Sequence, residues 1–429
     1  MYRRLGSREQ SSIGGPTDTF KLSIKGSLLL INQFKILLIA SLSVFLFCSL
    51  FLNNSVSTQL EALRLLDNSS NSTTWNFYSK ESPPSLNIKS LTSIEKRLRY
   101  YFPFDNNNDI ENNIWQLWNY RADDSKFPSK CFTHMERWRV ANLEYNHNLI
   151  TLDEAQIQFF DSFSYDMPEI VNAYNLLPDT RLKYDFLKYL IVFINGGIYA
   201  DIDTLDAKPL KFWYESTLKP SKMMVGIDVD YNDVNWDILY NRRLTFSTKI
   251  FKSKSHHPFL AKLIARIVYT IYNSIDEINS IDWNQAYQNV DSNDEPLIQF
   301  TSASIFTDTL FDYFNQLNNP VVHRVARTDK DLIPEQIFGP ETNKVFSYKL
   351  FTLSRGPTQV DDIVIMPQIT FKGPTSGYHR GALNFQSYDT EYDDENEKDD
   401  YYYARPLHFL SWDSLVEHKK VQHQQKLSI

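Results

Sequence analysis

The chain has 429 residues, of which 42% are hydrophobic and 14% aromatic, so it can bury a sizeable core and is not disordered throughout. Its 44 Lys and Arg against 52 Asp and Glu leave a net charge of −8, which argues against a nucleic-acid-binding surface. The two cysteines, Cys48 and Cys131, are too few for a disulfide framework or for a metal site built on thiolates.

The first expected element is a membrane-spanning helix at residues 36–52, a run of 17 residues without a charged side chain. As a helix this run would span roughly 25 Å, which is enough for a thin bilayer. Residues 1–35 carry a net charge of +4, so the positive-inside rule predicts that they form a cytoplasmic tail. We therefore expect an uncleaved signal anchor and a single-pass type II membrane protein. A cleaved signal peptide is the competing interpretation, but the residues after position 52 make a poor cleavage site.

Residues 53–105 are expected to form a lumenal stem, because Ser, Asn and Thr dominate most of this segment. Asn68 and Asn71 each begin a sequon for N-glycosylation, which fits a lumenal position. A short anchor favours an early secretory compartment over the thicker plasma membrane. The sequence thus predicts a Golgi membrane protein with its body in the lumen.

The body, residues 106–429, alternates short apolar runs with helical patterns. We expect a buried strand at residues 114–118, a helix around 132–143 and another helix over 153–175. This alternation favours an α/β fold with a largely parallel sheet. Residues 387–403 contain a strongly acidic run, which we interpret as an insertion that forms a solvated loop.

A helix followed by a strand and two aspartates is the most informative pattern in the body. Asp179 or Thr180 can cap a helix whose apolar residues recur at helical spacing up to residue 194. A Gly-Gly pair at residues 196–197 then stops the helix, and a short strand at 198–200 ends in Asp201 and Asp203. Alternation along a strand predicts that these two carboxylates point to the same side.

Two carboxylates side by side repel each other unless a cation lies nearby. Oxygen ligands without a thiol or histidine cluster suit a hard divalent ion such as Mg²⁺ or Mn²⁺. A diphosphate would supply further ligands, and the ion would neutralise the charge on a departing phosphate. The D-x-D pattern therefore predicts a metal-dependent diphosphate site, whereas simple solvation of a strand end is the plainer alternative.

The sequence LKYDFLKYL at residues 182–190, followed by GGIYADIDT at 196–204, resembles the core of the fungal initiation-specific α-1,6-mannosyltransferases, within family 32 of the glycosyltransferases. IWQLW at 114–118, YNRR at 240–243 and HHPFL at 256–260 match the same family in the same order. The resemblance implies a GT-A type fold, GDP-mannose as donor, Mn²⁺ (or Mg²⁺) as metal and an N-glycan or mannan as acceptor. It also implies a metal-dependent α-1,6-mannosyltransferase of the Golgi that retains the configuration at the transferred sugar.

The resemblance also implies roles for individual residues. Asp203 would bind the metal directly, Asp201 would hold metal and ribose, and Asp185 would bind hydroxyls of the donor sugar. These three are the expected catalytic residues, and His408 is the third expected metal ligand. The remaining expected donor contacts are Trp115, Lys188, Arg243 and Trp412.

Two departures from the family pattern leave a second function open. Lys188 replaces the usual Arg, which turns a forked hydrogen-bond donor into a point charge. Ser411 and Trp412 resemble a C-terminal Gly-Ser-Trp motif but lack its glycine. These departures motivate the alternative of a non-catalytic subunit in a mannan-synthesising complex. A sphingolipid glycosyltransferase and a phosphatase of the haloacid dehalogenase type are further alternatives, which the sequence fits less well.

The catalytic route is also left open. Retention could proceed by double displacement, with Asp228 or Asp230 as nucleophile by position only, or by front-face attack in which the leaving diphosphate takes the acceptor proton. Plainer interpretations stand beside the assigned roles. Asp185 and Lys188 are three residues apart and could form an ordinary helix ion pair, Trp115 could be a core aromatic, and Arg243 could be solvated.

Overall fold

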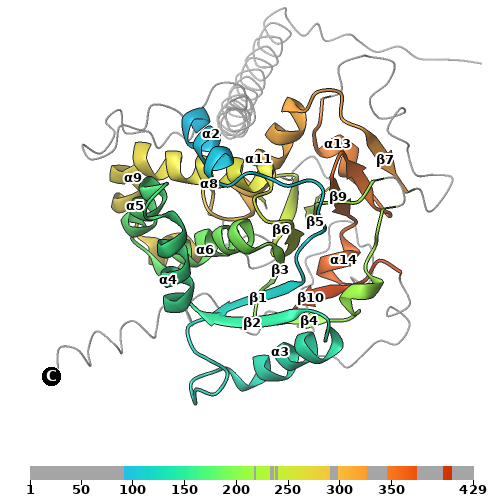
Figure 1. The fold of residues 1–429 in the computed structure, drawn as a ribbon, viewed down its shortest axis with the longest axis horizontal. Coiled ribbons are helices and arrows are strands. Elements are labelled where there is room, and N and C mark those ends of the chain that lie inside the picture. Colours follow the sequence, from blue (N-terminus) through green and yellow to red (C-terminus); the bar gives the residue numbers. More distant parts are fainter. Residues whose placement is uncertain are drawn as a thin grey trace, which may run out of the picture. The chain divides into compact units, whose positions relative to one another are not determined.

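The computed structural model describes residues 91–407 except for 217–218, 232–235, 237–239, 290–297, 326–344 and 374–399. These ranges contain an eight-stranded sheet in the order β2-β1-β3-β6-β5-β9-β8-β7, with helices on both faces (Figure 1). Six of these strands run in one direction, while β6 and β8 run in the other. The expected α/β class with a mostly parallel sheet is confirmed, with these two reversed strands as an addition.

The first half of the body follows the expected alternation of strands and helices. Its elements are β1 (Asn113–Trp118), α3 (Ser129–Ala141), β2 (Asn146–Thr151), α4 (Leu152–Phe163), α5 (Pro168–Leu176), α6 (Thr180–Asn195) and β3 (Gly197–Ala200). The single helix expected at 153–175 was wrong, because the segment forms two helices. Pro168 is the first residue of α5, where its missing N–H and restricted φ suit the start of a helix.

The second half supplies the reversed strands and a small second sheet. Its strands are β4 (Thr204–Asp206), β5 (Met223–Asp230), β6 (Leu244–Ser253), β7 (Val322–Arg324), β8 (Thr358–Val360), β9 (Ile363–Met366) and β10 (Ala404–Pro406). Its helices are a 3₁₀ turn (Leu210–Phe212), α8 (Pro258–Asn273), α9 (Ile275–Ser280), α10 (Trp283–Gln288), α11 (Ala303–Gln316), α13 (Tyr348–Phe351) and α14 (Ile369–Lys372). Strands β10 and β4 pair antiparallel, although about 200 residues of chain separate them.

Side chains that alternate along the central strands divide the core into two layers. Trp115 of β1 and Tyr199 of β3 join the larger layer, which packs under α4, α6, α8 and α11. Ile114 and Ile198, the preceding residues, join the smaller layer with Trp138 of α3. Figure 1 shows α6 and α8 on one side of the sheet and α3 on the other.

The connection from α6 to β3 forms as the sequence predicts. The Asp179 side chain accepts a hydrogen bond from the Arg181 backbone N–H at 2.8 Å and so caps α6. Gly196 and Gly197 both have positive φ angles, of 62° and 104°. A Cβ on Gly197 would lie 2.4 Å from the carbonyl oxygen of Asn113, so this turn requires glycine.

The helix α2 (Leu91–Tyr101) lies within the segment 53–105 that the sequence assigns to the stem. Its Ile94 and Leu98 are buried, and the helix packs on α8, so the folded body includes residues from 91 onward. Among the helices of the described residues, none combines the length and apolar character needed to cross a bilayer. The expected anchor at 36–52, the sequons at Asn68 and Asn71, and most of the acidic run at 387–403 lie outside the described residues.

Candidate functional site

The two aspartates of the D-x-D motif lie on a turn directly after β3. The strand ends at Ala200, and the Thr204 backbone N–H donates to the carbonyl oxygen of Asp201 at 3.2 Å. The expectation that both aspartates belong to the strand, and share a side because side chains alternate along it, was therefore wrong. A reverse turn, closed further by the Thr204 hydroxyl on the same carbonyl at 2.6 Å, brings the two residues together instead.

This turn, residues 201–204, is held by distant parts of the chain. The Asp201 N–H donates to the carbonyl of Lys249 on β6 at 2.9 Å, and Gln116 Nε2 of β1 donates to the Asp201 carbonyl at 3.3 Å. On the other side, the Leu407 N–H donates to the carbonyl of Asp203 at 2.8 Å. Three separate segments thus fix the backbone of the motif, which leaves its position well determined.

The carboxylate of Asp201 is oriented by two buried tyrosines. The Tyr199 hydroxyl donates to Asp201 Oδ1 at 2.7 Å, and the Tyr184 hydroxyl of α6 lies 3.4 Å from the same oxygen. Tyr184 also donates to the carbonyl of Leu117 at 3.1 Å. Burial raises the pKa of Asp201 to about 6, with the charge of Asp203 adding to this increase and that of Lys188 opposing it. The pKa is raised because burial disfavours the charged form of the carboxyl, while the charges of Lys188 and Asp203 act on it in opposite directions.

The second aspartate, Asp203, is partly exposed and lies near the first turns of α3. Burial raises the pKa of the Cys131 thiol to about 12, and the charge of Asp203 contributes to this increase. Burial lowers the pKa of His134, with Arg137 and Arg405 lowering it further and Asp203 opposing them. The sequence analysis did not identify His134 or Arg405 as neighbours of the motif. The only sequence signal for His134 is that it lies three residues after Cys131, on the same helix face.

Asp185 and Lys188 form a buried ion pair on α6. Lys188 Nζ lies 2.7 Å from Asp185 Oδ1, and the two side chains are only 3% and 4% exposed, respectively. The other oxygen, Asp185 Oδ2, accepts from the Thr301 hydroxyl at 3.2 Å, and Lys188 also reaches the Thr248 hydroxyl at 3.4 Å. Both groups are therefore engaged with protein partners in this conformation. Their expected roles on the donor sugar stay predictions.

The structure does not bring all expected donor contacts to the motif. Trp115 is 7% exposed, packs in the larger core layer and donates its indole N–H to the carbonyl of Gly196 at 2.9 Å. Arg243 stacks on the ring of Tyr348, with its guanidinium carbon 4.4 Å from the ring centroid. Asp201 lies beside Lys249 of β6. Arg243 precedes Lys249 by six positions in the chain, so its backbone is roughly 20 Å from Asp201 along the strand. His408 and Trp412 lie outside the described residues.

The residues of this turn suit a hard divalent ion. The charge of Asp203 acts on the pKa of Asp201, so the two carboxylates lie close together, and both offer the oxygen ligands that Mg²⁺ and Mn²⁺ prefer. Within the described ranges, however, no three His, Cys, Asp or Glu side chains gather closely enough to hold a metal on their own. His408, the third metal ligand that the sequence predicts, lies outside the described residues.

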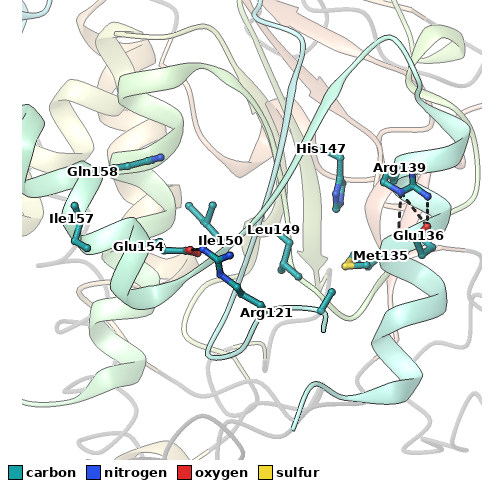
Figure 2. A pocket seen from close by; sticks show the side chains of 11 residues that line it. Arg121, Met135, Glu136, Arg139, His147, Leu149, Ile150, Glu154, Ile157 and Gln158 are labelled. Carbon is teal, nitrogen blue, oxygen red and sulfur yellow. Dashed lines mark hydrogen bonds and ion pairs between the residues drawn. The ribbon is translucent and has the colours of Figure 1, made fainter. Parts of the chain in front are cut away.

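A cavity of about 580 Å³ lies beside β2, between α3 and α4 (Figure 2). Its charged side chains pair with each other, Arg139 with Glu136 and Arg121 with Glu154, as Figure 2 shows. His147 in its wall lies 2.8 Å from Gln116 Oε1, and Gln116 in turn holds the Asp201 carbonyl. Because its own charges are paired and the aspartates do not line it, this cavity is a poor candidate for a metal–diphosphate site.

Comparisons with known proteins match the region of the motif. A family described as "Glycosyltransferase sugar-binding region containing DXD motif" matches residues 128–222, which include α3, α6 and the turn at 201–204. An initiation-specific α-1,6-mannosyltransferase of Candida albicans is 29% identical over 65% of this chain and 70% of its own length. The Saccharomyces cerevisiae enzyme of the same name is 26% identical over 66% of this chain and 76% of its length. A putative glycosyltransferase of S. cerevisiae is 29% identical over 69% of this chain and 65% of its length.

Proposed function

We propose that this chain is a glycosyltransferase with a DXD-containing sugar-binding region and that it transfers mannose from GDP-mannose to an N-glycan or mannan acceptor. We take the linkage to be α-1,6, as the names of the Candida and Saccharomyces relatives suggest. The proposal includes a GT-A type fold, a divalent metal such as Mn²⁺ and retention at the transferred sugar. The observation that carries it is the turn at 201–204, which presents two neighbouring carboxylates at the carboxyl end of a buried strand.

Asp201 and Asp203 would hold the metal with the donor diphosphate. A divalent ion at this position would neutralise the charge that develops on the departing diphosphate. The chain itself contributes orientation, since Tyr199 and Tyr184 fix one oxygen of Asp201 and Leu407 fixes the backbone of Asp203. Such preorganisation matters because the carboxylates need not reorganise during the reaction.

The front-face route is the one that we propose for the transfer. Asp230, one of the two nucleophile candidates, accepts from the Thr352 hydroxyl at 2.8 Å and from the Leu353 N–H at 2.6 Å, so both its oxygens are committed to a neighbouring loop. In front-face attack the leaving diphosphate takes the proton of the acceptor hydroxyl, and no enzyme nucleophile is needed. We further propose that residues 36–52 anchor the protein in the Golgi membrane with its catalytic domain in the lumen.

The test is to measure GDP release from GDP-mannose by the full chain purified in detergent, with Mn²⁺ and with excess chelator. An α-1,6-linked mannobiose and an N-glycan core would serve as acceptors, and UDP-glucose as a donor control. We expect metal-dependent release from GDP-mannose alone, together with transfer to at least one mannose acceptor. Metal-dependent GDP binding without release would favour a non-catalytic subunit. Neither binding nor release by a folded chain would contradict the donor assignment.

A further inference from the structure

The carboxyl end of β5 lies at the same edge of the sheet as the D-x-D turn. β3 and β5 run in the same direction, separated by the antiparallel β6. Tyr199 of β3 pairs with Phe251 of β6, which pairs with Val225 of β5, so these residues form one row across the sheet. Asp201 follows Tyr199 by two residues and Asp228 follows Val225 by three. Both aspartates therefore follow this row toward the same edge of the sheet, on strands that are two strand spacings, or roughly 10 Å, apart, with the irregular pairing of β5 and β6 between them.

The backbone of Asp228 is held from α14. Its carbonyl oxygen accepts hydrogen bonds from Gln368 Nε2 at 2.7 Å and from Lys372 Nζ at 3.1 Å. This close approach requires Gly226, because a Cβ there would lie 2.4 Å from the Phe371 ring. The pairing of β5 with β6 is irregular on both sides of Ile227, and such bulges often redirect a side chain beside an active site.

The side chain of Asp228 differs from the other carboxylates of this edge. It is half-buried, and within the described residues its carboxylate makes neither a hydrogen bond nor an ion pair. Asp230 is bound by Thr352 and Leu353, Asp185 by Lys188 and Thr301, and Asp201 by Tyr199. Asp228 thus combines a fixed backbone with a carboxylate whose capacity to accept hydrogen bonds is available to a ligand.

The helix α14 links Asp228 to the D-x-D turn from a second direction. The Tyr403 N–H donates to the Thr370 carbonyl at 3.1 Å, which joins α14 to the segment that leads into β10. β10 pairs with β4 directly after the turn, and Leu407 at its end bonds Asp203. The helix α14 therefore packs against both β5, which carries Asp228, and β10, beyond which Leu407 holds the backbone of Asp203.

We propose that Asp228 is a catalytic residue on the acceptor side, which accepts a hydrogen bond from a non-reacting hydroxyl of the acceptor sugar and so orients the attacking hydroxyl toward the donor. The inference rests on the proposed function. The acceptor oxygen forms the new bond to C1 of mannose, while the bond from C1 to the diphosphate oxygen breaks and its electron pair stays with GDP. The acceptor proton passes to that GDP oxygen, so Asp228 remains a carboxylate throughout and serves by positioning the hydroxyl.

The experiment compares Asp228→Asn and Asp161→Asn with the unchanged full chain in detergent. Asp161 is an exposed residue of α4, so it controls for the loss of one negative charge away from this edge. We expect Asp228→Asn to lower kcat/KM for the mannobiose acceptor by about 100-fold, because the amide can donate as well as accept and misorients the hydroxyl. The Kd for GDP with Mn²⁺ should stay unchanged, and Asp161→Asn should match the unchanged chain in both measurements.

Three outcomes would overturn the inference. The first is acceptor kinetics of Asp228→Asn that match those of the unchanged chain. The second is a loss of GDP binding together with transfer, which would assign Asp228 to the donor or to the fold; thermal unfolding of the variant separates these two. The third is an unchanged chain that binds GDP but transfers no mannose. In that case the proposed function fails first, and the role of Asp228 fails with it.

Discussion

Two pairs of charged residues lie on neighbouring elements: one joins opposite charges, and the other places two negative charges close together. Asp185 on α6 is buried beside Lys188, whose ammonium lies 2.7 Å from it, so its charge is neutralised within the protein. Asp201 and Asp203 follow β3, and the pKa of Asp201 is raised to about 6 chiefly by burial, with the charge of Asp203 contributing. The first pair is complete without a ligand, whereas the second places two carboxylates close together, where a bound divalent cation would stabilise both.

This difference separates structural from functional charge. A buried ion pair that loses one partner leaves an uncompensated charge, so its removal destabilises the fold. A like-charge pair that loses one member is relieved of repulsion, so its removal leaves stability equal or higher and acts on function alone. Stability and activity should therefore respond in opposite ways at the two sites.

The largest expected effect is on activity at the D-x-D turn. Asp203→Asn should lower GDP release from GDP-mannose by about 1,000-fold or more, since several kcal/mol of transition-state stabilisation depend on the bound ion. The same variant should unfold at an equal or higher temperature than the unchanged chain, because the repulsion on Asp201 is removed. GDP release and thermal unfolding measured on the same sample test both statements. A variant that is inactive and also clearly less stable would contradict the separation of roles.

The buried pair on α6 should show the reverse pattern. Lys188→Met leaves Asp185 buried without its cation, which is expected to lower the free energy of unfolding by about 3–5 kcal/mol. The double variant Asp185→Asn with Lys188→Met removes both charges and should recover part of this loss. Urea unfolding of both variants is the measurement. Equal stability of Lys188→Met and the unchanged chain would show that the pair is not structural.

The local part of this comparison could be predicted from the sequence. The apolar spacing of α6, the cap at Asp179 and the glycines at 196–197 are signals between neighbours in the chain, and each appears as expected. The prediction of a metal at the D-x-D pattern follows from residue types alone. These features depend on local backbone preferences, which a single sequence carries.

The features that depend on distant contacts could not be predicted. The turn at 201–204 is anchored by Leu407, and Arg242 is bound through both its Nε and a terminal nitrogen to Asp308, 66 residues away. Neither pairing has a local sequence signal. The reversed β6 likewise needs β3 and β5 on either side of it to define its direction. The break between α4 and α5, by contrast, did have a local sequence signal, because Pro168 favours the start of a new helix. The sequence analysis gave more weight to the helical periodicity and so expected a single helix.

A smaller effect is expected from Asp206, which follows the turn on β4. Burial raises the pKa of its carboxyl from 3.8 to about 7, while Asn142 donates to one of its oxygens at 2.8 Å and lowers it. The folded state therefore holds a proton that the unfolded state releases above pH 4, so this group's contribution to stability is lost as the pH rises from about 4 to about 7. Between about pH 4 and about pH 7 the free energy of unfolding of the unchanged chain should therefore fall by roughly 2–4 kcal/mol more than that of Asp206→Asn. Urea unfolding at both ends of the window, with Asp161→Asn as control, measures the difference. Parallel pH dependence in all three proteins would contradict the shift.

The smallest effect concerns Tyr199, which orients Asp201, a carboxylate that we propose binds the metal. Tyr199→Phe removes the hydroxyl that donates to Asp201 Oδ1 at 2.7 Å and leaves the ring in the core. Loss of such an outer hydrogen bond typically costs about 10-fold in metal affinity, so the Kd for Mn²⁺ in the presence of GDP should rise by that factor. Tyr272→Phe is the matched control, because it removes a buried hydroxyl that donates to the Glu169 carbonyl at 3.1 Å, away from the turn. If the two variants bind Mn²⁺ equally well, the Tyr199 hydroxyl does not orient Asp201 for the metal, and the contrast between the two charge pairs rests on burial rather than on this hydrogen bond.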